Sequence, residues 1–156
     1  MSKKRLRIIV GCTIGAFSAF AVCLSPSASS AQTDVEKTVQ HAMTKGEDGM
    51  YRAYDGFFVK WLPHFGDASA VALTKILADK PIGDADIPAI LMVVRDSYDA
   101  PVSIEDAADR NPRTTIYLLR SLSQDTKDPK NLTLIEQTTA YVKSQYAAYL
   151  KNHPNE

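Results

Sequence analysis

Cysteine is almost absent from this chain of 156 residues. Cys12 and Cys23 are the only two, and both lie close to the N-terminus. Small exported domains often depend on disulfides because their hydrophobic cores are marginal. A disulfide in the body of this chain is excluded, so the folded domain has to be held together by apolar packing.

The sequence also lacks the motifs of common catalytic and cofactor sites. It contains neither a Gly-x-Ser-x-Gly motif nor a glycine-rich phosphate loop, and its acidic stretches lack the alternating oxygens and central glycine of a calcium loop. Histidine occurs only three times, at His41, His64 and His153. We therefore predict no catalytic residue, no cofactor and no metal, and no stretch resembles a known family well enough to name one.

The N-terminus has the pattern of a secretory signal peptide. Residues 8–24 carry no charge, residues 25–31 are small and polar, and the stretch before them is basic, with Lys3, Lys4, Arg5 and Arg7. This order of basic, apolar and small-residue regions is typical of an export signal. We predict that residues 1–31 are removed between Ala31 and Gln32, and that the protein is periplasmic or extracellular.

Two other interpretations of this segment stay open. Residues 8–24 are slightly long for a cleaved signal, so they can instead remain as a single membrane anchor. A lipoprotein would be modified at Cys23, but the bulky Val22 fits poorly beside a lipidated cysteine.

Residues 32–156 form one predicted domain with a mildly acidic charge. Removal of four of the 18 Lys and Arg leaves 14 against 18 Asp and Glu, a net charge near −4. This balance argues against nucleic acid or an anionic membrane surface as the main partner.

The longest apolar stretch of this domain is Ile87–Val94, which contains no polar side chain. It is too short to span a bilayer and has no polar face, so we expect it at the centre of the fold. A buried strand is the alternative to a helix here. No other stretch of the domain alternates apolar and polar β-branched residues, so a lone strand would lack a partner, and we predict a helix that continues to about Tyr98.

The remaining segments predict an all-α domain of six to seven short helices. Capping signals, proline positions and helical periodicity mark them. We expect a helix begun by Thr33–Glu36, an aromatic helix from Met50 to Leu62, a helix over 68–79 capped by Asp67, the central helix capped by Asp84 or Asp86, a short helix from Ser103, a helix opened by Asn111-Pro112, and a last helix from Asp128-Pro129 to about Lys151, followed by a frayed tail. Stacked helical hairpins, as in HEAT-like repeats, and a closed orthogonal bundle around Ile87–Val94 are both compatible with this order.

Several residues are candidates for contact with a ligand or partner. The aromatic stripe that includes Tyr51, Tyr54 and Trp61 can line a groove, although its helical spacing is also that of a core face. His64, three residues before Asp67, can pair with that carboxylate or share a metal with it. Arg113 and Arg120 lie two turns apart on one predicted helix face, near Arg110, and can form a basic patch.

Three functions follow from these features. The first is an exported interaction protein of the cell envelope without catalytic activity, for example an inhibitor or immunity-type protein that occludes another envelope protein. The second is a carrier or sensor of a small ligand with a pocket under Tyr51, Tyr54 and Trp61. The third is a small enzyme built on Asp/His pairs, which requires His64, Asp67 and a further acidic residue to meet in one cleft. Asp55, Asp96 and Asp99 are candidates for the paired carboxylates of a hydrolase.

Overall fold

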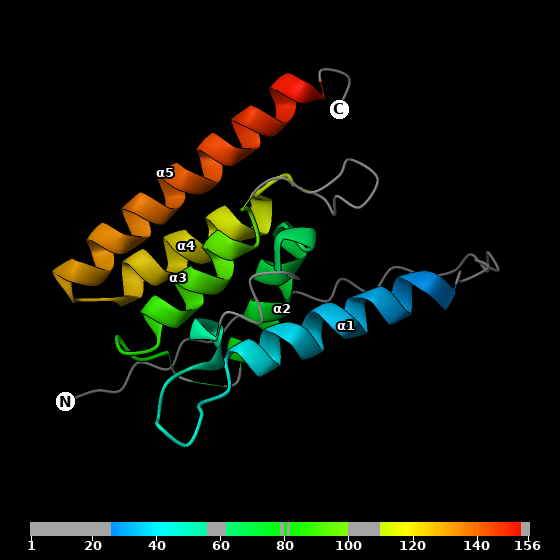
Figure 1. Cartoon of the computed structure of the whole chain (residues 1–156). Coiled ribbons are helices and arrows are strands. Elements are labelled where there is room, and N and C mark those ends of the chain that lie inside the picture. Colours follow the sequence, from blue (N-terminus) through cyan, green and yellow to red (C-terminus); the bar gives the residue numbers. More distant parts are fainter. Residues whose placement is uncertain (1–25, 56–61, 79, 81, 100–109, 154–156) are drawn as a thin grey trace, which may run out of the picture.

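The described part of the protein is built from α-helices. The computed structural model describes residues 26–55, 62–78, 80, 82–99 and 110–153, with side chains from residue 34 onward (Figure 1). Within these ranges there is no strand, so the all-α prediction is confirmed. The α-helices are α1 (Pro26–Ala42), α2 (Asp67–Leu77), α3 (Ile87–Asp96), α4 (Arg113–Asp125) and α5 (Pro129–Asn152), with short 3₁₀ helices η1 (Arg52–Tyr54) and η3 (Leu62–His64).

Helix α3 supplies the largest part of the core, as predicted for Ile87–Val94. Six of its residues are buried: Ile87, Ala89, Ile90, Leu91, Val93 and Val94. The helix packs against α5, α2 and both 3₁₀ helices, so it has almost no solvent face. Pro88 fits in its first turn because the backbone N–H there has no helical acceptor. The helix ends at Asp96 rather than Tyr98, and Tyr98 is fully buried just beyond it.

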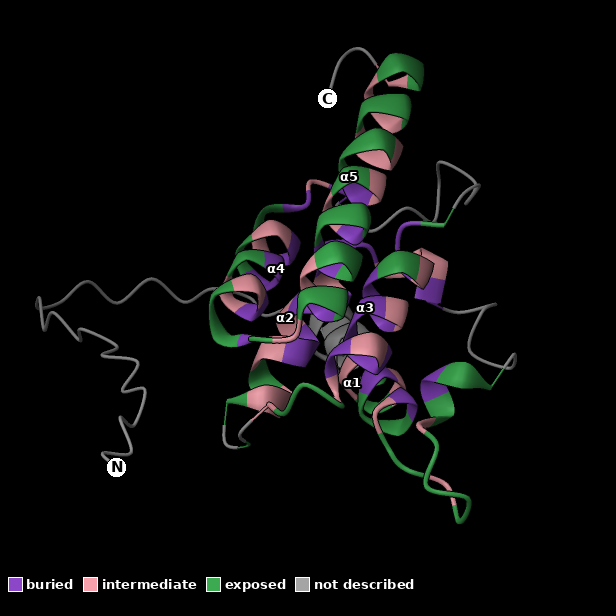
Figure 2. Cartoon of the chain, turned by 90° about the vertical axis from the view of Figure 1, so that its left-hand side faces the viewer, coloured by how far each residue is buried: buried purple, intermediate pink, exposed green. Residues whose placement is uncertain are grey.

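The other main contacts join α1 to α2, α2 to α4, and α4 to α5. Helix α1 buries Val35, Val39 and Ala42, which recur at helical spacing on one face. Figure 2 shows that α5, the longest helix, reaches beyond the others, and its buried residues all lie in the part up to Val142. The core is thus made by the inner faces of α1, α2, α3 and α4 together with the first half of α5.

The predicted start of the first helix is wrong. Helix α1 begins at Pro26 and not at the Thr33–Glu36 capping box. The Ala, Ser and Gln residues before Thr33 are compatible with a helix, so a Thr-x-x-Glu pattern does not mark the start here. The predicted cleavage point between Ala31 and Gln32 lies inside this helix. The short helix predicted from Ser103 lies outside the described residues.

Three other capping predictions have different outcomes. Asp128 caps α5 as predicted, because its carboxylate accepts a hydrogen bond from Lys130 N at 2.9 Å. Asp86 occupies the N-cap position of α3, but its side chain does not cap that helix. Asn111 is not the N-cap of α4, because Pro112 holds that position.

The carboxylate of Asp67 caps a different helix from the one predicted. Asp67 is the first residue of α2, after Gly66 with a positive φ of 49°. Its Oδ2 accepts from Thr114 N at 3.0 Å, and its Oδ1 accepts from Thr115 N at 2.7 Å, both in the first turn of α4. Helix α4 has no acidic residue in its own first turn. Asp67 therefore supplies from α2 the negative charge that the N-terminus of α4 requires.

Replacement of Asp67 by Ala tests this long-range cap. We expect Asp67→Ala to lower the free energy of unfolding by about 2–3 kcal/mol, because it leaves buried N–H donors without acceptors. Asp128→Ala is the matched control, since it removes an exposed local cap worth about 1 kcal/mol. Urea denaturation followed by circular dichroism measures both. An equal loss in the two variants would show that the Asp67 contacts add nothing beyond an ordinary cap.

Candidate functional site

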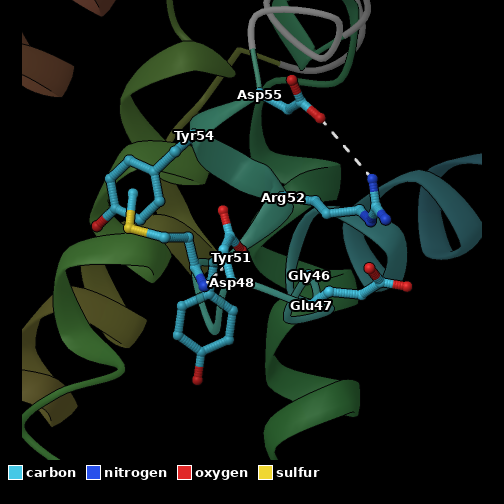
Figure 3. Close-up of a pocket in the computed structure, with 8 residues that line it drawn as sticks. Gly46, Glu47, Asp48, Tyr51, Arg52, Tyr54 and Asp55 are labelled. Atoms are coloured by element: carbon cyan, nitrogen blue, oxygen red, sulfur yellow. Dashed lines mark hydrogen bonds and ion pairs between the residues drawn. The ribbon is translucent and has the colours of Figure 1, made fainter.

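A pocket is formed by the loop between α1 and η1. It has a volume of about 440 Å³. Its lining consists of Gly46, Glu47, Asp48, Met50, Tyr51, Arg52, Tyr54 and Asp55 (Figure 3). We call residues 46–55 the pocket loop. Two of the predicted contact residues, Tyr51 and Tyr54, thus lie in one site.

The pocket loop is a short hairpin-like turn and not the predicted aromatic helix. Gly46 N donates to Met50 O at 2.8 Å, and Lys45 and Tyr51 form an isolated antiparallel bridge. Gly49 has a φ of 77°, a left-handed conformation that favours glycine. A helix beginning at Met50 is therefore wrong, because these bonds turn the chain back on itself. Residues 56–61, including Trp61, lie outside the described part of the chain.

Tyr51 fixes the pocket loop to the core. Its hydroxyl donates a hydrogen bond to Oδ1 of Asp86, at the start of α3. The ammonium group of Lys45 lies 4.8 Å from the centre of the Tyr51 ring, close enough for a cation–π contact. Oδ2 of Asp86 also accepts from Gly83 N at 3.0 Å. The Tyr51 hydroxyl is thus engaged by the protein itself, and Tyr51 positions the loop.

The hydrogen bond between Tyr51 and Asp86 raises the pKa of the tyrosine and lowers that of the aspartate. Burial and the Asp86 carboxylate raise the pKa of Tyr51 to about 12, so the phenol keeps its proton. The same hydrogen bond lowers the pKa of Asp86 against the opposing effect of burial. At physiological pH the neutral Tyr51 phenol therefore donates a hydrogen bond to the charged Asp86 carboxylate.

The outer part of the pocket loop combines exposed apolar and acidic side chains. Met50 is 56% exposed and Tyr54 is 42% exposed. In Figure 3 the rings of Tyr51 and Tyr54 lie on one side of the loop, whereas Arg52 and Glu47 lie on the other. Arg52 pairs with Asp55 at 3.8 Å, and the lining also contains the carboxylates of Glu47 and Asp48. The site has a net negative charge beside an apolar edge.

The structure does not bring the other predicted contact residues into this pocket. His64 lies in η3, partly buried, and Arg113 and Arg120 are exposed on α4. None of the three belongs to the lining. Arg110 is not part of a basic patch with them, because it is 6% exposed and its guanidinium donates to the carbonyl oxygens of Tyr98 and Pro63. The predicted place of Arg110 in a basic patch is therefore wrong, because its position in the sequence does not reveal that the side chain points inward.

A second carboxylate cluster lies where α3 ends against α5. Burial and the charge of Asp99 raise the pKa of Asp96 to about 6, although Arg95 opposes the shift. The hydroxyl of Tyr141 donates to Asp99, and the Arg95 guanidinium lies 4.9 Å from the centre of the Tyr141 ring. A carboxyl group with a pKa near 6 is suited to proton transfer. The three carboxylates predicted for a hydrolase do not form one site. Asp55 lies in the pocket loop, away from Asp96, and Asp99 is hydrogen-bonded to Tyr141.

Residues of the site that the sequence analysis missed are Glu47, Asp48 and Met50. The dipeptide Asp48-Gly49 is a turn signal, and it sits directly before the predicted aromatic helix. It was the one available indication that the chain reverses there, and a reversal would have placed these side chains at an exposed tip.

Among the described side chains, no three His, Cys, Asp or Glu residues lie together as a metal site. In the same part of the chain, the structure contains no helix with the length and apolar character needed to cross a membrane. No protein-family model, curated protein or solved structure matches the chain, so these comparisons suggest no activity, ligand or partner.

The hydrogen bond between Tyr51 and Asp86 predicts a stability effect that depends on pH. We expect Tyr51→Phe to lower the free energy of unfolding by about 1 kcal/mol near pH 7. The pKa of Asp86 is lower in the folded state, so the contribution is full above the unfolded pKa and is lost as the pH falls. Urea titrations from pH 3 to 8 measure the difference, with Tyr54→Phe as the control. A loss that stays constant over this range would contradict the assignment.

The raised pKa of Asp96 predicts the opposite dependence. Because the folded state holds this proton more tightly, the free energy of unfolding decreases as the pH rises from about 4 to about 6. Asp96→Asn removes the cost of ionising this carboxyl group in the folded state. We expect the variant to be more stable above pH 6 by about 1 kcal/mol, a value that allows for solvent screening at this half-exposed position. The gain should disappear below about pH 4. The exposed Asp34→Asn is the control, and an Asp96→Asn variant that is less stable at pH 8 would contradict the prediction.

Proposed function

We propose that this chain is a non-catalytic interaction protein of the cell envelope, and that it binds a basic partner protein through the pocket loop. The observation that supports this proposal most directly is the pair of exposed apolar side chains, Met50 and Tyr54, at the edge of an acidic pocket. Aromatic residues and methionine are enriched at protein interfaces. The export part of the proposal rests on the signal-peptide pattern of residues 1–31.

The anchoring of the loop supports a binding role. A contact surface that is already ordered loses less conformational entropy when a partner binds. The Tyr51–Asp86 hydrogen bond and the bond from Arg52 N to Thr44 O at 2.9 Å hold both sides of the loop. Met50 and Tyr54 are therefore presented on a fixed backbone although their side chains are exposed.

The charge of the site favours a basic partner. Glu47, Asp48 and Asp55 outweigh Arg52, and the predicted mature domain is acidic as a whole. Charge complementarity mainly increases the rate of association and the specificity of binding. In its most concrete form, the protein occludes the functional site of a basic envelope protein, as an inhibitor or immunity-type protein does.

A small-ligand carrier or sensor is the second candidate, because the pocket volume of about 440 Å³ lies in the range of small-molecule sites. The lining favours the protein partner over a small ligand. Four of its eight residues are charged, and Tyr51, one of its two aromatic rings, already has Lys45 against its face.

A crosslinking pull-down from the envelope of the producing cells tests the proposal. The bait is the full chain with a C-terminal tag, and a Met50→Ser/Tyr54→Ser variant is compared with it. We expect one dominant basic protein, captured at least tenfold less by the double variant because the apolar edge is lost. Leu134→Ser is the matched control, since Leu134 is an exposed apolar residue of α5.

Capture of the same protein by the double variant at an undiminished level would show that the pocket loop is not the contact surface. An empty lane for the wild-type chain would contradict the interaction proposal and favour the small ligand. Equilibrium dialysis of the purified chain against a small-molecule extract of the same envelope would then follow.

A further inference from the structure

We propose that the outer face of helix α4 is a second interaction surface, which binds an acidic segment of a partner protein. The surface consists of Arg113, Tyr117 and Arg120, and we call it the α4 face. It shares no residue with the pocket loop, and the two lie apart in both views of the molecule (Figures 1 and 2). The inference therefore does not depend on the function proposed for the loop.

The three side chains form one stripe. They occupy positions i, i+4 and i+7, which place residues on the same side of a helix over about 10 Å. Tyr117 is 70% exposed, the highest value among the large hydrophobic residues that the structure describes. The opposite side of α4 is buried through Thr115, Leu118, Leu119 and Leu122. Because that side is held in the core, the orientation of the α4 face is fixed.

The charge on this helix departs from what its stability requires. Arg113 is the first residue of α4, where the helix dipole disfavours a positive charge. From Arg113 to Gln124 the sequence contains no acidic residue. Residues that oppose a local stability rule without a structural gain are often functional. Asp67 provides the negative charge at this end of the helix, so the fold can keep an arginine there.

Arg113 and Arg120 are both exposed on α4. Among the described residues, neither guanidinium is paired with a carboxylate. When the Asn111 side-chain amide is turned so that its oxygen faces Arg113, this oxygen accepts from Arg113 Nε at 3.1 Å, a contact that leaves the guanidinium charge in place. Arginine binds carboxylates through two parallel hydrogen bonds, and tyrosine and arginine, like tryptophan, are enriched among interface hot spots.

The chemistry of the stripe selects the occupant. Two guanidinium groups on either side of one aromatic ring match a segment with carboxylates that flank an apolar side chain. The carboxylates would be about three residues apart in an extended chain, since each extended residue spans about 3.3 Å and the stripe is about 10 Å long. An acidic polypeptide segment meets this requirement. The predicted mature domain is acidic as a whole, so the basic α4 face differs in charge from the domain that carries it.

Photocrosslinking in the producing cells tests the α4 face. Tyr117 is replaced by p-benzoylphenylalanine in the full chain, and the crosslinked peptide is identified by mass spectrometry. We expect a protein segment in which Asp and Glu outnumber Lys and Arg. The Arg113→Glu/Arg120→Glu double variant should reduce the yield at least tenfold because it reverses the charge of the surface.

Two controls make the result specific. Lys143→Glu/Lys151→Glu imposes the same change of charge on exposed residues of α5 and should leave the yield unchanged. The same crosslinker at position 134 should not capture the same segment. Circular dichroism of each purified variant verifies that it is folded.

The inference is overturned if no crosslink forms at position 117, if the captured segment is neutral or basic, or if the product is a lipid. Equal losses in the arginine and lysine double variants would also overturn it, because they would show a general charge effect. A synthetic copy of the captured segment that binds the purified wild-type chain at least tenfold more tightly than the Arg113→Glu/Arg120→Glu variant completes the test.

Discussion

The carboxylate of Asp67 joins the start of α2 to the first turn of α4 and to Tyr98, which lies just beyond α3. It accepts hydrogen bonds from two backbone N–H groups and the Thr115 hydroxyl of α4, and a longer one, at 3.4 Å, from the hydroxyl of Tyr98. A buried carboxylate is costly unless hydrogen bonds replace its water, and here the first turn of another helix supplies them. The same contacts satisfy donors that every helix start leaves open. The hydrogen bonds to Asp67 therefore help to fix the position of α4 against α2, beside the apolar contacts of the core.

Other polar contacts repeat this arrangement at the edges of the core. The Ser97 hydroxyl donates to the Ser69 hydroxyl at 2.7 Å, which links the end of α3 to α2. The Asn131 side chain of α5 donates to the Asp84 backbone oxygen at 2.9 Å, before the start of α3. These bonds specify which helix ends meet, because each donor has its acceptor on a different helix or connection. Leu, Ile and Val side chains alone would tolerate several alternative packings.

The sequence allowed prediction of features whose cause is local and not of those whose cause is distant. Ile87–Val94 was predicted to lie at the centre of the fold because a continuous apolar run has no polar face to turn toward water. The start of the last helix was predicted from Asp128-Pro129 because the capping residue is adjacent to the helix that it caps. Asp67 and Asp86 were expected to cap the helices that follow them, but their acceptor atoms serve Thr115 and Tyr51, which are remote in the sequence. Of the candidate site, Tyr51 and Tyr54 were predicted from their residue type. Their neighbours in the pocket depend on the reversal at Gly49, which helical periodicity concealed.

The two exposed surfaces depend on the core in the same way. The pocket loop is held by Tyr51 on Asp86, at the start of α3, and the α4 face is oriented by Asp67, at the start of α2. In each case a buried or partly buried hydrogen bond fixes the backbone, and the side chains a few residues further on are left exposed. Met50 and Tyr54 lie beside carboxylates, whereas Tyr117 lies between arginines. The two proposed surfaces thus differ in charge, so the charge pattern of one repels a partner that the other attracts.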